Sequence, residues 1–270
     1  MNLITFNPFR TLGIPHVQYV KPEAMFREVQ RLKQADVLLF PEHWQLNAIL
    51  YGIKRPVFPS AASIHLGHNK VEMTRALWTV CPESVPYTEI LSNTPEHIEQ
   101  VLDTFPFPFI AKEIKNSMGY GVYKIENREQ FLNYAGRNEV LYVQEYLPGD
   151  RDLRVCFVGD EVIAAYWRVG SNDNFRHNVA QGGTIIYELI PKEAIELVTR
   201  VARELGINHA GFDIMFHDGV PYILEFNTLF GNQGVQAMGI SVEEKIWSYL
   251  QTNFDPKCPP TPATPFNKAS

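Results

Sequence analysis

The stretch of residues 210–231 reads AGFDIMFHDGVPYILEFNTLFG and contains two predicted strands. Two runs in it alternate apolar residues with others, as β-strands do, and the Asp-Gly pair at 218–219 indicates a turn between them. Burying both apolar sets on one face places Asp213 opposite Glu225. A two-residue turn does not give this register, so we predict an odd-length loop or a bulge at 217–220. The two apolar sets are Phe212, Ile214 and Phe216 in the first run, and Tyr222, Leu224 and Phe226 in the second.

Three oxygen-donating side chains share the other face of this predicted hairpin, namely Asp213, Glu225 and Asn227. Two carboxylates and an amide oxygen suit Mg²⁺, a hard cation that takes such ligands together with phosphates and water. Magnesium with phosphates indicates a nucleotide site. For the spacing alone, an ordinary amphipathic hairpin with a polar outer face is the simpler interpretation. The choice between this hairpin and a metal site therefore depends on the rest of the chain.

The composition is that of an ordinary globular protein, with 270 residues, 45% hydrophobic and 20% charged. The formal net charge of −6 gives no general attraction to nucleic acid or to anionic lipid. No run is long enough for a membrane helix, and residues 1–9 lack the features of a signal peptide, so we expect a cytoplasmic protein. The widely spaced Cys81, Cys156 and Cys258 favour free thiols over a disulfide framework or a zinc cluster.

The first quarter of the chain indicates a small α/β unit. Residues 3–6 and 36–40 have the apolar character of strands, and 22–34 has the spacing of an amphipathic helix between them. Residues 56–59 (PVFP) suit a short edge strand, because each proline removes a hydrogen-bond donor.

Two lysines and a glycine-containing loop follow. Lys70 lies in the first half of a helix predicted over 65–80, and Lys112 ends a strand predicted over 106–112, after a loop over 81–89 and a helix over 94–102. A phosphate clamp and a glycine-containing hairpin loop beside a surface lysine both fit the segment after Lys112. Its small residues, which let backbone N–H groups approach phosphate oxygens, are Ser117, Gly119 and Gly121.

Strands with charged side chains come next. Residues 140–146 form a strong strand pattern, and 155–165 form a hairpin around a Gly-Asp pair. Asp152 and Arg154 face the same way on an extended strand, and Arg168 ends the next one. Two arginines near a magnesium site can neutralise charge on a transferred phosphoryl group, whereas each taken singly fits a surface ion pair equally well.

The last third indicates helices around the central hairpin. Residues 175–183 have the composition of a loop, and 191–205 have helical spacing with a glycine C-cap at Gly206. A closing helix is predicted over 241–250. Residues 255–270 hold five prolines and little to bury, so we expect no stable structure there.

In their order and spacing these segments resemble the ATP-grasp superfamily, and within it the RimK-like amino-acid ligases that include the ribosomal-protein glutamate ligase. The resemblance covers about residues 69–250. Each segment alone is common, but the set is specific, including the twelve-residue step from Asp213 to Glu225. The segments are NK, FPFIAK with SMGYGV, VQEYLPGDRDLRV, the strand end AAYWR, FRHNVAQGG, AGFD and LEFN.

The resemblance implies an α/β and α+β architecture with the ATP-grasp fold. It divides the chain into a short N-terminal α/β domain (1–68), an ATP-grasp domain of two α+β subdomains that clasp ATP (69–252) and a proline-rich tail (253–270). It further implies that Lys70 and Lys112 contact the ATP phosphates under the loop of Ser117, Gly119 and Gly121. The other nucleotide contacts implied are Gln144, Glu145, Tyr146 and Leu147 at the adenine, Asp152 near the ribose, and Arg176, His177 and Asn178, the last near the phosphates.

The resemblance also implies a metal site and a reaction. Asp213, Glu225 and Asn227 would hold two Mg²⁺ ions, for which Mn²⁺ could substitute, and Arg154 and Arg168 would stabilise the transferred phosphoryl group and an acyl-phosphate. The implied activity is that of an ATP-dependent carboxylate-amine ligase, which adds an amino acid such as glutamate to a small molecule, a peptide or a protein tail. No nucleic-acid or membrane partner is expected, and a homo-oligomer is compatible with the sequence.

The residues themselves fit this chemistry, because they contain no convincing nucleophile-base pair and such catalysis is mostly positioning and charge neutralisation. Two alternatives stay open, an ATP-grasp kinase acting on a small-molecule hydroxyl and a non-catalytic nucleotide-binding module. Asn69 stands where the family usually has Asp, Gln181 where the glutamate ligase has a basic residue, and the segment after Asn227 lacks the usual proline. These departures leave the substrate undefined.

Overall fold

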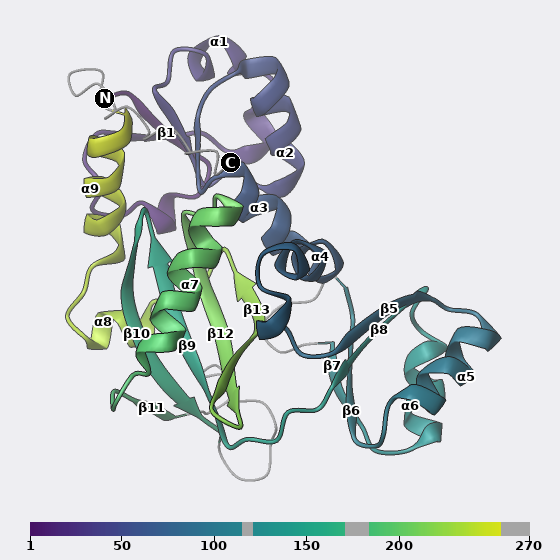
Figure 1. Cartoon of the computed structure of the whole chain (residues 1–270). Coiled ribbons are helices and arrows are strands. Elements are labelled where there is room, and N and C mark those ends of the chain that lie inside the picture. The colour runs from purple at the N-terminus through teal and green to yellow at the C-terminus, as the bar shows by residue number, and fades with distance from the viewer. Residues whose placement is uncertain (115–120, 171–183, 255–270) are drawn as a thin grey trace, which may run out of the picture. The chain divides into compact units, whose positions relative to one another are not determined.

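The computed structural model describes residues 1–114, 121–170 and 184–254. The chain divides into two compact units, one formed by Met1–Pro59 with Ser241–Ser270 and the other by Ser60–Ile240 (Figure 1). The first unit contains one sheet and the second contains two. The predicted loop residues Ser117, Gly119, Arg176, His177 and Asn178, and the tail 255–270, lie outside the described residues.

The first unit contains a parallel four-stranded sheet in the order β2-β1-β3-β4. The inner strands β1 and β3 are fully buried, and β4 lies at the edge between two prolines, as predicted. The elements are β1 (Leu3–Thr5), η1 (Pro8–Arg10), β2 (Val17–Tyr19), η2 (Pro22–Ala24), α1 (Val29–Leu32), β3 (Val37–Leu39), α2 (His43–Asn47), η3 (Ala48–Ile53), β4 (Val57–Phe58) and α9 (Val242–Phe254).

The prediction of one amphipathic helix over 22–34 is wrong. The chain instead begins with a 3₁₀ turn, in which the N–H of Met25 donates to the carbonyl of Pro22 at 3.1 Å, and it continues through turns to the four-residue helix α1. Tight i to i+3 bonds after the proline replace the regular α-helical bonds. The irregular path still buries both Met25 and Leu32 completely.

The second unit begins with two helices and a small antiparallel sheet in the order β5-β8-β6-β7, with α5 and α6 on one face (Figure 1). The side chain of Thr94 caps α5, as predicted. Strand β5 overlaps the end of the predicted loop 81–89. Apolar and polar residues alternate only weakly in its sequence TEILS, and its pairing with β8 stabilises the strand. The elements are α3 (Ala61–His68), α4 (Lys70–Val80), η4 (Pro82–Ser84), β5 (Thr88–Ser92), α5 (Pro95–Thr104), β6 (Phe109–Lys112), β7 (Val122–Ile125), α6 (Arg128–Ala135) and β8 (Val140–Glu145).

A five-stranded antiparallel sheet in the order β11-β10-β9-β12-β13 completes this unit. Helices α4 and α7 cover one face of it and bury a large apolar cluster, including Leu77, Val198 and Phe212. Helix α7 ends at Gly206 in the left-handed conformation (φ +69°), as predicted. The elements are β9 (Arg151–Val158), β10 (Glu161–Val169), β11 (Thr184–Ile186), α7 (Lys192–Leu205), β12 (His209–His217), β13 (Val220–Asn227) and α8 (Gln233–Ala237).

The predicted helix over 65–80 is two helices, α3 and α4, separated at Asn69. Asn69 has an extended backbone (φ −139°, ψ 120°), and its side chain accepts a hydrogen bond from the N–H of Val71 at 2.8 Å. Asparagine is a strong N-cap because its carboxamide oxygen satisfies an otherwise unpaired helix N–H. Lys70 is therefore the first residue of α4 rather than part of the middle of a longer helix.

Asn69→Ala should lower the free energy of unfolding by about 1 kcal/mol, because it removes this cap. Asn69→Asp should leave stability nearly unchanged, because aspartate caps equally well. Urea unfolding of the three proteins measures both effects. Equal stability of the alanine variant and the parent would show that the break after α3 does not depend on the cap.

The hairpin of β12 and β13 has the predicted pairing of Asp213 with Glu225, but its irregularity lies elsewhere than predicted. The turn has only two residues, Asp218 (φ +49°) and Gly219 (φ +80°), and His217 pairs with Val220. The register shifts between Asp213 and Ile214, where Leu224 has no cross-strand partner. The prediction of an odd loop or a bulge at 217–220 is therefore wrong, since a bulge at Leu224 produces the shift.

The bulge also changes which side chains of β13 face the core. Ile223 and Phe226 are both 1% exposed and pack with Phe212 and Ile214, whereas Leu224 is only partly buried. A regular strand would alternate, so two core residues three apart require one extra residue between them. Placing Tyr222 and Leu224 on the core face was wrong, but Glu225 keeps the predicted face.

Candidate functional site

Four charged side chains lie on the sheet face opposite the apolar cluster. Asp152 and Arg154 come from β9, Arg168 from β10 and Asp213 from β12, and each is between 4% and 6% exposed. They share a face because they occupy alternate positions on paired strands, with Arg168 opposite Asp152 and Asp213 opposite Arg154. The sequence prediction that Asp152 and Arg154 face the same way is confirmed.

These side chains form one hydrogen-bonded network. Arg154 donates to Asp213 through Nε (2.5 Å) and Nη2 (3.2 Å), and Arg168 donates to Asp152 through Nε (2.7 Å) and Nη2 (2.6 Å). Nη2 of Arg168 also lies 3.0 Å from Oδ1 of Asp213. Burial alone would raise the pKa of Asp213, but the two guanidinium groups outweigh it and hold that pKa below its usual value.

Glu225 and Asn227 continue this face on β13. Oε2 of Glu225 lies 3.4 Å from Nζ of Lys70, and Oε1 accepts a hydrogen bond from the side-chain amide of Asn227 at 3.2 Å. Lys70 is 7% exposed, so the N-terminal end of α4 brings a nearly buried cation to the acidic strand. The structure therefore brings Lys70 beside the predicted acidic pair of Asp213 and Glu225.

The bulge brings the second predicted lysine to the same place. Nζ of Lys112 donates to the carbonyl of Leu224 at 3.4 Å, and it lies 5.6 Å from the ring centre of Tyr142. The pKa of Lys112 is lowered to about 8, chiefly by burial and also by nearby Lys70, although Glu225 and Asp213 oppose the shift. The residue that breaks the strand pairing thus offers its carbonyl to a lysine from the other sheet.

The residues predicted to hold the adenine have partners within the protein. The side-chain amide of Gln144 donates to Oγ1 of Thr88 at 2.8 Å, and Glu145 accepts from the N–H of Tyr87 at 2.6 Å. Leu147 is 7% exposed, and Nζ of Lys124 lies 5.1 Å from the ring centre of Tyr146. Lys124 could not be predicted from the sequence, because a lone lysine on an edge strand carries no motif.

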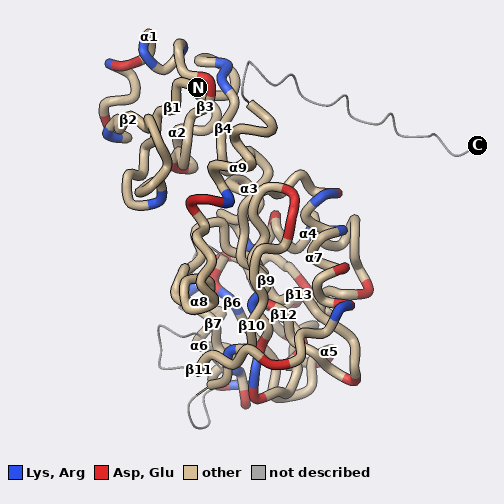
Figure 2. Tube along the Cα trace, turned by 90° about the vertical axis from the view of Figure 1, so that its left-hand side faces the viewer, with Lys and Arg blue, Asp and Glu red and all other residues tan. Residues whose placement is uncertain are grey.

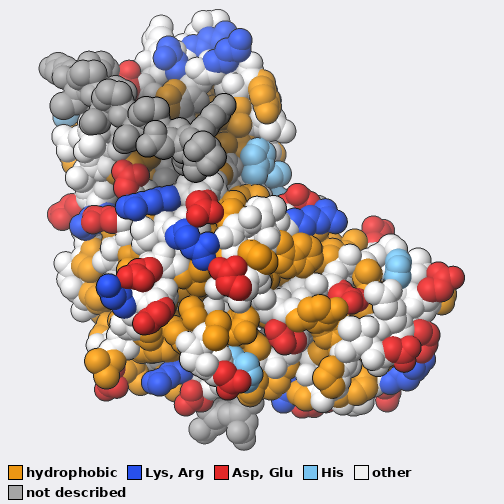
Figure 3. All heavy atoms as spheres, in the orientation of Figure 1, with side chains coloured by type: hydrophobic (Ala, Val, Ile, Leu, Met, Phe, Trp, Pro, Cys, Tyr) orange, Lys and Arg blue, Asp and Glu red, His pale blue; other side chains and the backbone are white. Residues whose placement is uncertain are grey.

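Cationic side chains outnumber acidic ones by one among the residues of this site. Lys70, Lys112, Arg154 and Arg168 face Asp152, Asp213 and Glu225. A buried site with an excess of positive charge favours an anionic ligand such as a polyphosphate. On the face that Figure 3 shows, and along the trace in Figure 2, both signs of charge are interspersed, and the formal net charge of the whole chain is −6.

The donor set fits a hard divalent cation by its chemistry. Asp213, Glu225 and Asn227 offer oxygen atoms on one sheet face, which is what Mg²⁺ and Mn²⁺ take. Among the residues that the structure describes, no group of three or more His, Cys, Asp or Glu side chains is arranged to hold a metal ion. The metal site therefore stays a prediction that depends on two carboxylates and one amide.

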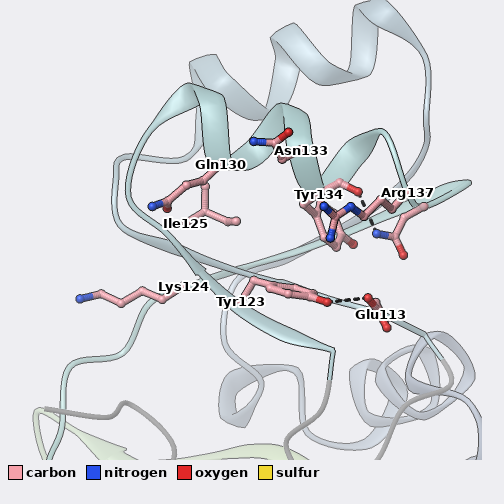
Figure 4. Close-up of a pocket in the computed structure, with 9 residues that line it drawn as sticks. Glu113, Tyr123, Lys124, Ile125, Gln130, Asn133, Tyr134 and Arg137 are labelled. Atoms are coloured by element: carbon pink, nitrogen blue, oxygen red, sulfur yellow. Dashed lines mark hydrogen bonds between the residues drawn. The ribbon is translucent and has the colours of Figure 1, made fainter.

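A separate cavity of about 280 Å³ lies between β7 and α6 (Figure 4). The hydroxyl of Tyr123 donates to Oε1 of Glu113 at 2.7 Å on its wall, and the hydroxyl of Tyr134 donates to the carbonyl of Lys112 at 2.8 Å.

No helix in the described ranges has the length and apolarity needed to cross a membrane.

Comparison with solved structures defines the class of fold. D-alanine–D-alanine ligase from Bacillus anthracis superposes with a TM-score of 0.72 at 12% identity, over 93% of this chain and 97% of that one. A RimK domain protein ATP-grasp from Sphaerobacter thermophilus superposes with a TM-score of 0.71 at 15% identity, over 92% and 99%. The predicted ATP-grasp fold is therefore confirmed.

The model of the RimK-like ATP-grasp domain matches residues 76–250, and the chain belongs to that family. A probable alpha-L-glutamate ligase from Trichodesmium erythraeum is 34% identical over 155 residues, which are 54% of this chain and 52% of that protein. The ribosomal protein bS6–L-glutamate ligase from Escherichia fergusonii is 28% identical over 181 residues, or 64% and 60%. The matched region spans between half and three fifths of these two relatives.

Proposed function

We propose that the protein is an ATP-dependent carboxylate-amine ligase that forms an amide through an acyl-phosphate. The observation that carries the proposal is the buried face of β9, β10 and β12, where Arg154 and Arg168 flank Asp213 beside the two lysines at Glu225 and Leu224. It combines cations for phosphate with oxygen donors for a metal. The names of the glutamate ligase relatives and the family membership support the same class of reaction.

In this proposal the lysines and arginines have different tasks. Lys70 and Lys112 bind the polyphosphate of ATP, since both are nearly buried and lie next to the acidic strand. Arg154 and Arg168 use Nε and Nη2 within the network, and Nη1 of each makes no hydrogen bond to any residue in the described ranges. Those Nη1 donors are available for charge that develops on the transferred phosphoryl group.

Asp213, Glu225 and Asn227 would hold the divalent ions. Bound there, such ions supply neutralisation of phosphate charge and polarisation of the phosphoryl group. The chain's own part is to keep these oxygens on one face and to hold the guanidinium groups beside them. The low pKa of Asp213 keeps its carboxylate ionised at neutral pH.

The reaction then balances without a protein nucleophile. An oxygen of the substrate carboxylate attacks the γ-phosphorus, and ADP leaves. The nitrogen of an amine attacks the acyl carbon, phosphate leaves with its bonding electrons, and the amine loses a proton to solvent. Positioning and exclusion of water are what the protein has to supply.

Because the reaction consumes ATP, we place it in the cytoplasm. L-glutamate is the first amine to test, because the relatives are named for it.

The proposal is tested by incubating the purified protein with Mg²⁺, ATP and a library of amino acids and peptides, following phosphate release and product mass together. A product heavier by one amino acid minus water, with phosphate released, supports the ligase. A product heavier by a phosphoryl group, without free phosphate, would replace it with the kinase. Saturable ATP binding with no turnover would favour a nucleotide-binding module.

Raising the pH through 8 should weaken ATP binding. The lowered pKa of Lys112 means that the free protein loses this charge above about pH 8, and the ammonium form is the one that attracts phosphate. Affinity should therefore fall by up to about tenfold for each pH unit above 8, with uptake of a proton on binding. Calorimetry in buffers of different ionisation enthalpy measures both, and Lys112→Met should remove the pH dependence. A flat profile between pH 7 and 9.5 in the parent protein would count against this role.

A further inference from the structure

The carboxamide oxygen of Asn232 is buried without a hydrogen-bond partner. Among the side chains in the described ranges, Oδ1 of Asn232 is the single buried oxygen or nitrogen in this state. An unpaired buried acceptor destabilises the folded protein, and native structures rarely keep one without a use. The oxygen therefore calls for a hydrogen-bond donor from outside the described chain.

The fold does not use this oxygen locally. Asn232 is the residue before helix α8, where an asparagine normally caps the helix by accepting from a backbone N–H. Here its backbone is helical (φ −91°, ψ −5°), and its side chain makes no capping hydrogen bond. The five-residue helix forms without the carboxamide, so that the side chain is available for another partner.

The segment that carries Asn232 packs on the arginine face of the sheet at both of its ends. A Cβ added to Gly211 would lie 2.8 Å from Nη1 of Arg154 and 2.8 Å from Cβ of Phe230, so both side chains close over this glycine. On the other side of Asn232 in the chain, a Cβ added to Gly234 would fall among the ring atoms of Tyr166. Tyr166 pairs with Arg154 across β9 and β10, which places Asn232 in a segment anchored beside Arg154.

The missing hydrogen-bond partner of this oxygen must be a donor, that is, an N–H or an O–H group. Among the proposed reactants, the phosphates of ATP and an ionised carboxylate present acceptors at their reacting ends, and the amine presents N–H donors. On the basis of the proposed function, we propose that Asn232 accepts a hydrogen bond from the acceptor amine and that it is a specificity-determining residue for that substrate. It fixes the amine next to Arg154, where the acyl-phosphate forms.

Two measurements on Asn232→Leu test this assignment, with Asn232→Ala as a second variant that adds no bulk. In the ligand-free protein, replacing an unpaired buried acceptor with an apolar group should raise the melting temperature by about 2 to 4 °C. With Mg²⁺, ATP, a carboxylate substrate from the library screen and L-glutamate as the probe amine, the KM for the amine should rise about 10- to 100-fold, while the KM for ATP changes little. Carboxylate-dependent positional isotope exchange in ATP, which needs no amine, separates the first step from the second.

Asn138→Leu is the matched control. Asn138 is also partly buried, but its amide donates to the carbonyl of Tyr134 at 2.8 Å. This variant should lower the melting temperature and leave the KM for the amine as in the parent.

A fall in melting temperature for Asn232→Leu and Asn232→Ala, like that of the control, would show that the oxygen has a partner in the protein and would overturn the assignment. A rise in melting temperature with an unchanged KM for the amine would overturn it as well. If the parent protein, given Mg²⁺ and ATP, forms no hydroxamate from hydroxylamine and any carboxylate of the amino-acid and peptide library, and shows no carboxylate-dependent isotope exchange, the ligase proposal itself fails. The proposed hydrogen bond from the amine to Asn232 then fails with it.

Discussion

Asp213→Asn is expected to reduce turnover by at least about 10³-fold and to lower the free energy of unfolding by about 3 kcal/mol. The substitution keeps the size of the side chain but removes its charge, and Asp213 is 5% exposed between Arg154 and Arg168. Arg154 then loses the carboxylate that it binds, and Arg168 keeps only that of Asp152. Phosphate release and urea unfolding, measured on the same preparation, give the two effects.

Asp218→Asn is the control for this change, because it makes the same substitution in the same hairpin at an exposed turn. Its backbone has a positive φ, which asparagine adopts readily, so stability and turnover should match the parent. If Asp213→Asn were as stable and as active as Asp218→Asn, neither the network nor the metal site would depend on this carboxylate.

Arg154→Lys is expected to lower kcat by about 10²- to 10³-fold with little change in the KM for ATP. Lysine keeps the positive charge, but it cannot bind both oxygens of Asp213 and still present a donor to the transferred group. Steady-state kinetics separate kcat from KM. Because Arg154 is 6% exposed, a moderate loss of stability should accompany the kinetic effect.

Arg200→Lys provides the comparison for this arginine. Arg200 pairs with Glu83 at 3.0 Å, and its side chain is 41% exposed, so lysine should replace it without loss of activity. A rise in the KM for ATP at unchanged kcat in Arg154→Lys would assign Arg154 to nucleotide binding instead of the transferred group.

Alternation along the strands made much of the site predictable. Because a strand turns every second side chain to the same face, the sequence alone placed Arg154 with Asp152, and Asp213 with Glu225. The helix and cap signals at Thr94 and Gly206 were also reliable, since each depends on the local backbone. Local rules therefore predicted which side chains share a face.

The features that the sequence did not predict depend on partners far along the chain. Leu224 is an ordinary residue in a strand, and its carbonyl is used by Lys112, which is 112 residues away. Tyr142, which lies beneath that lysine, has the sequence pattern of any buried strand residue. Asn69 ends one helix and begins another, and in the sequence it stands inside an unbroken helical pattern. Asn232 is an asparagine directly before a helix, which is a recognisable pattern in the sequence. Only its burial and its missing hydrogen bond in the structure distinguish an unpaired acceptor from a helix cap.

The bulge at Leu224 also determines how the hairpin tolerates insertions and deletions. It separates the inner pairs of the strand, which hold Glu225 and Asn227, from the outer pairs that lead to the turn at 218–219. Because Leu224 has no cross-strand partner, an insertion or deletion at the tip can be accommodated at the bulge before the inner pairs have to move. Deletion of Leu224 itself would remove the bulge. Either the carboxylate of Glu225 or the core side chain of Ile223 would then have to change face.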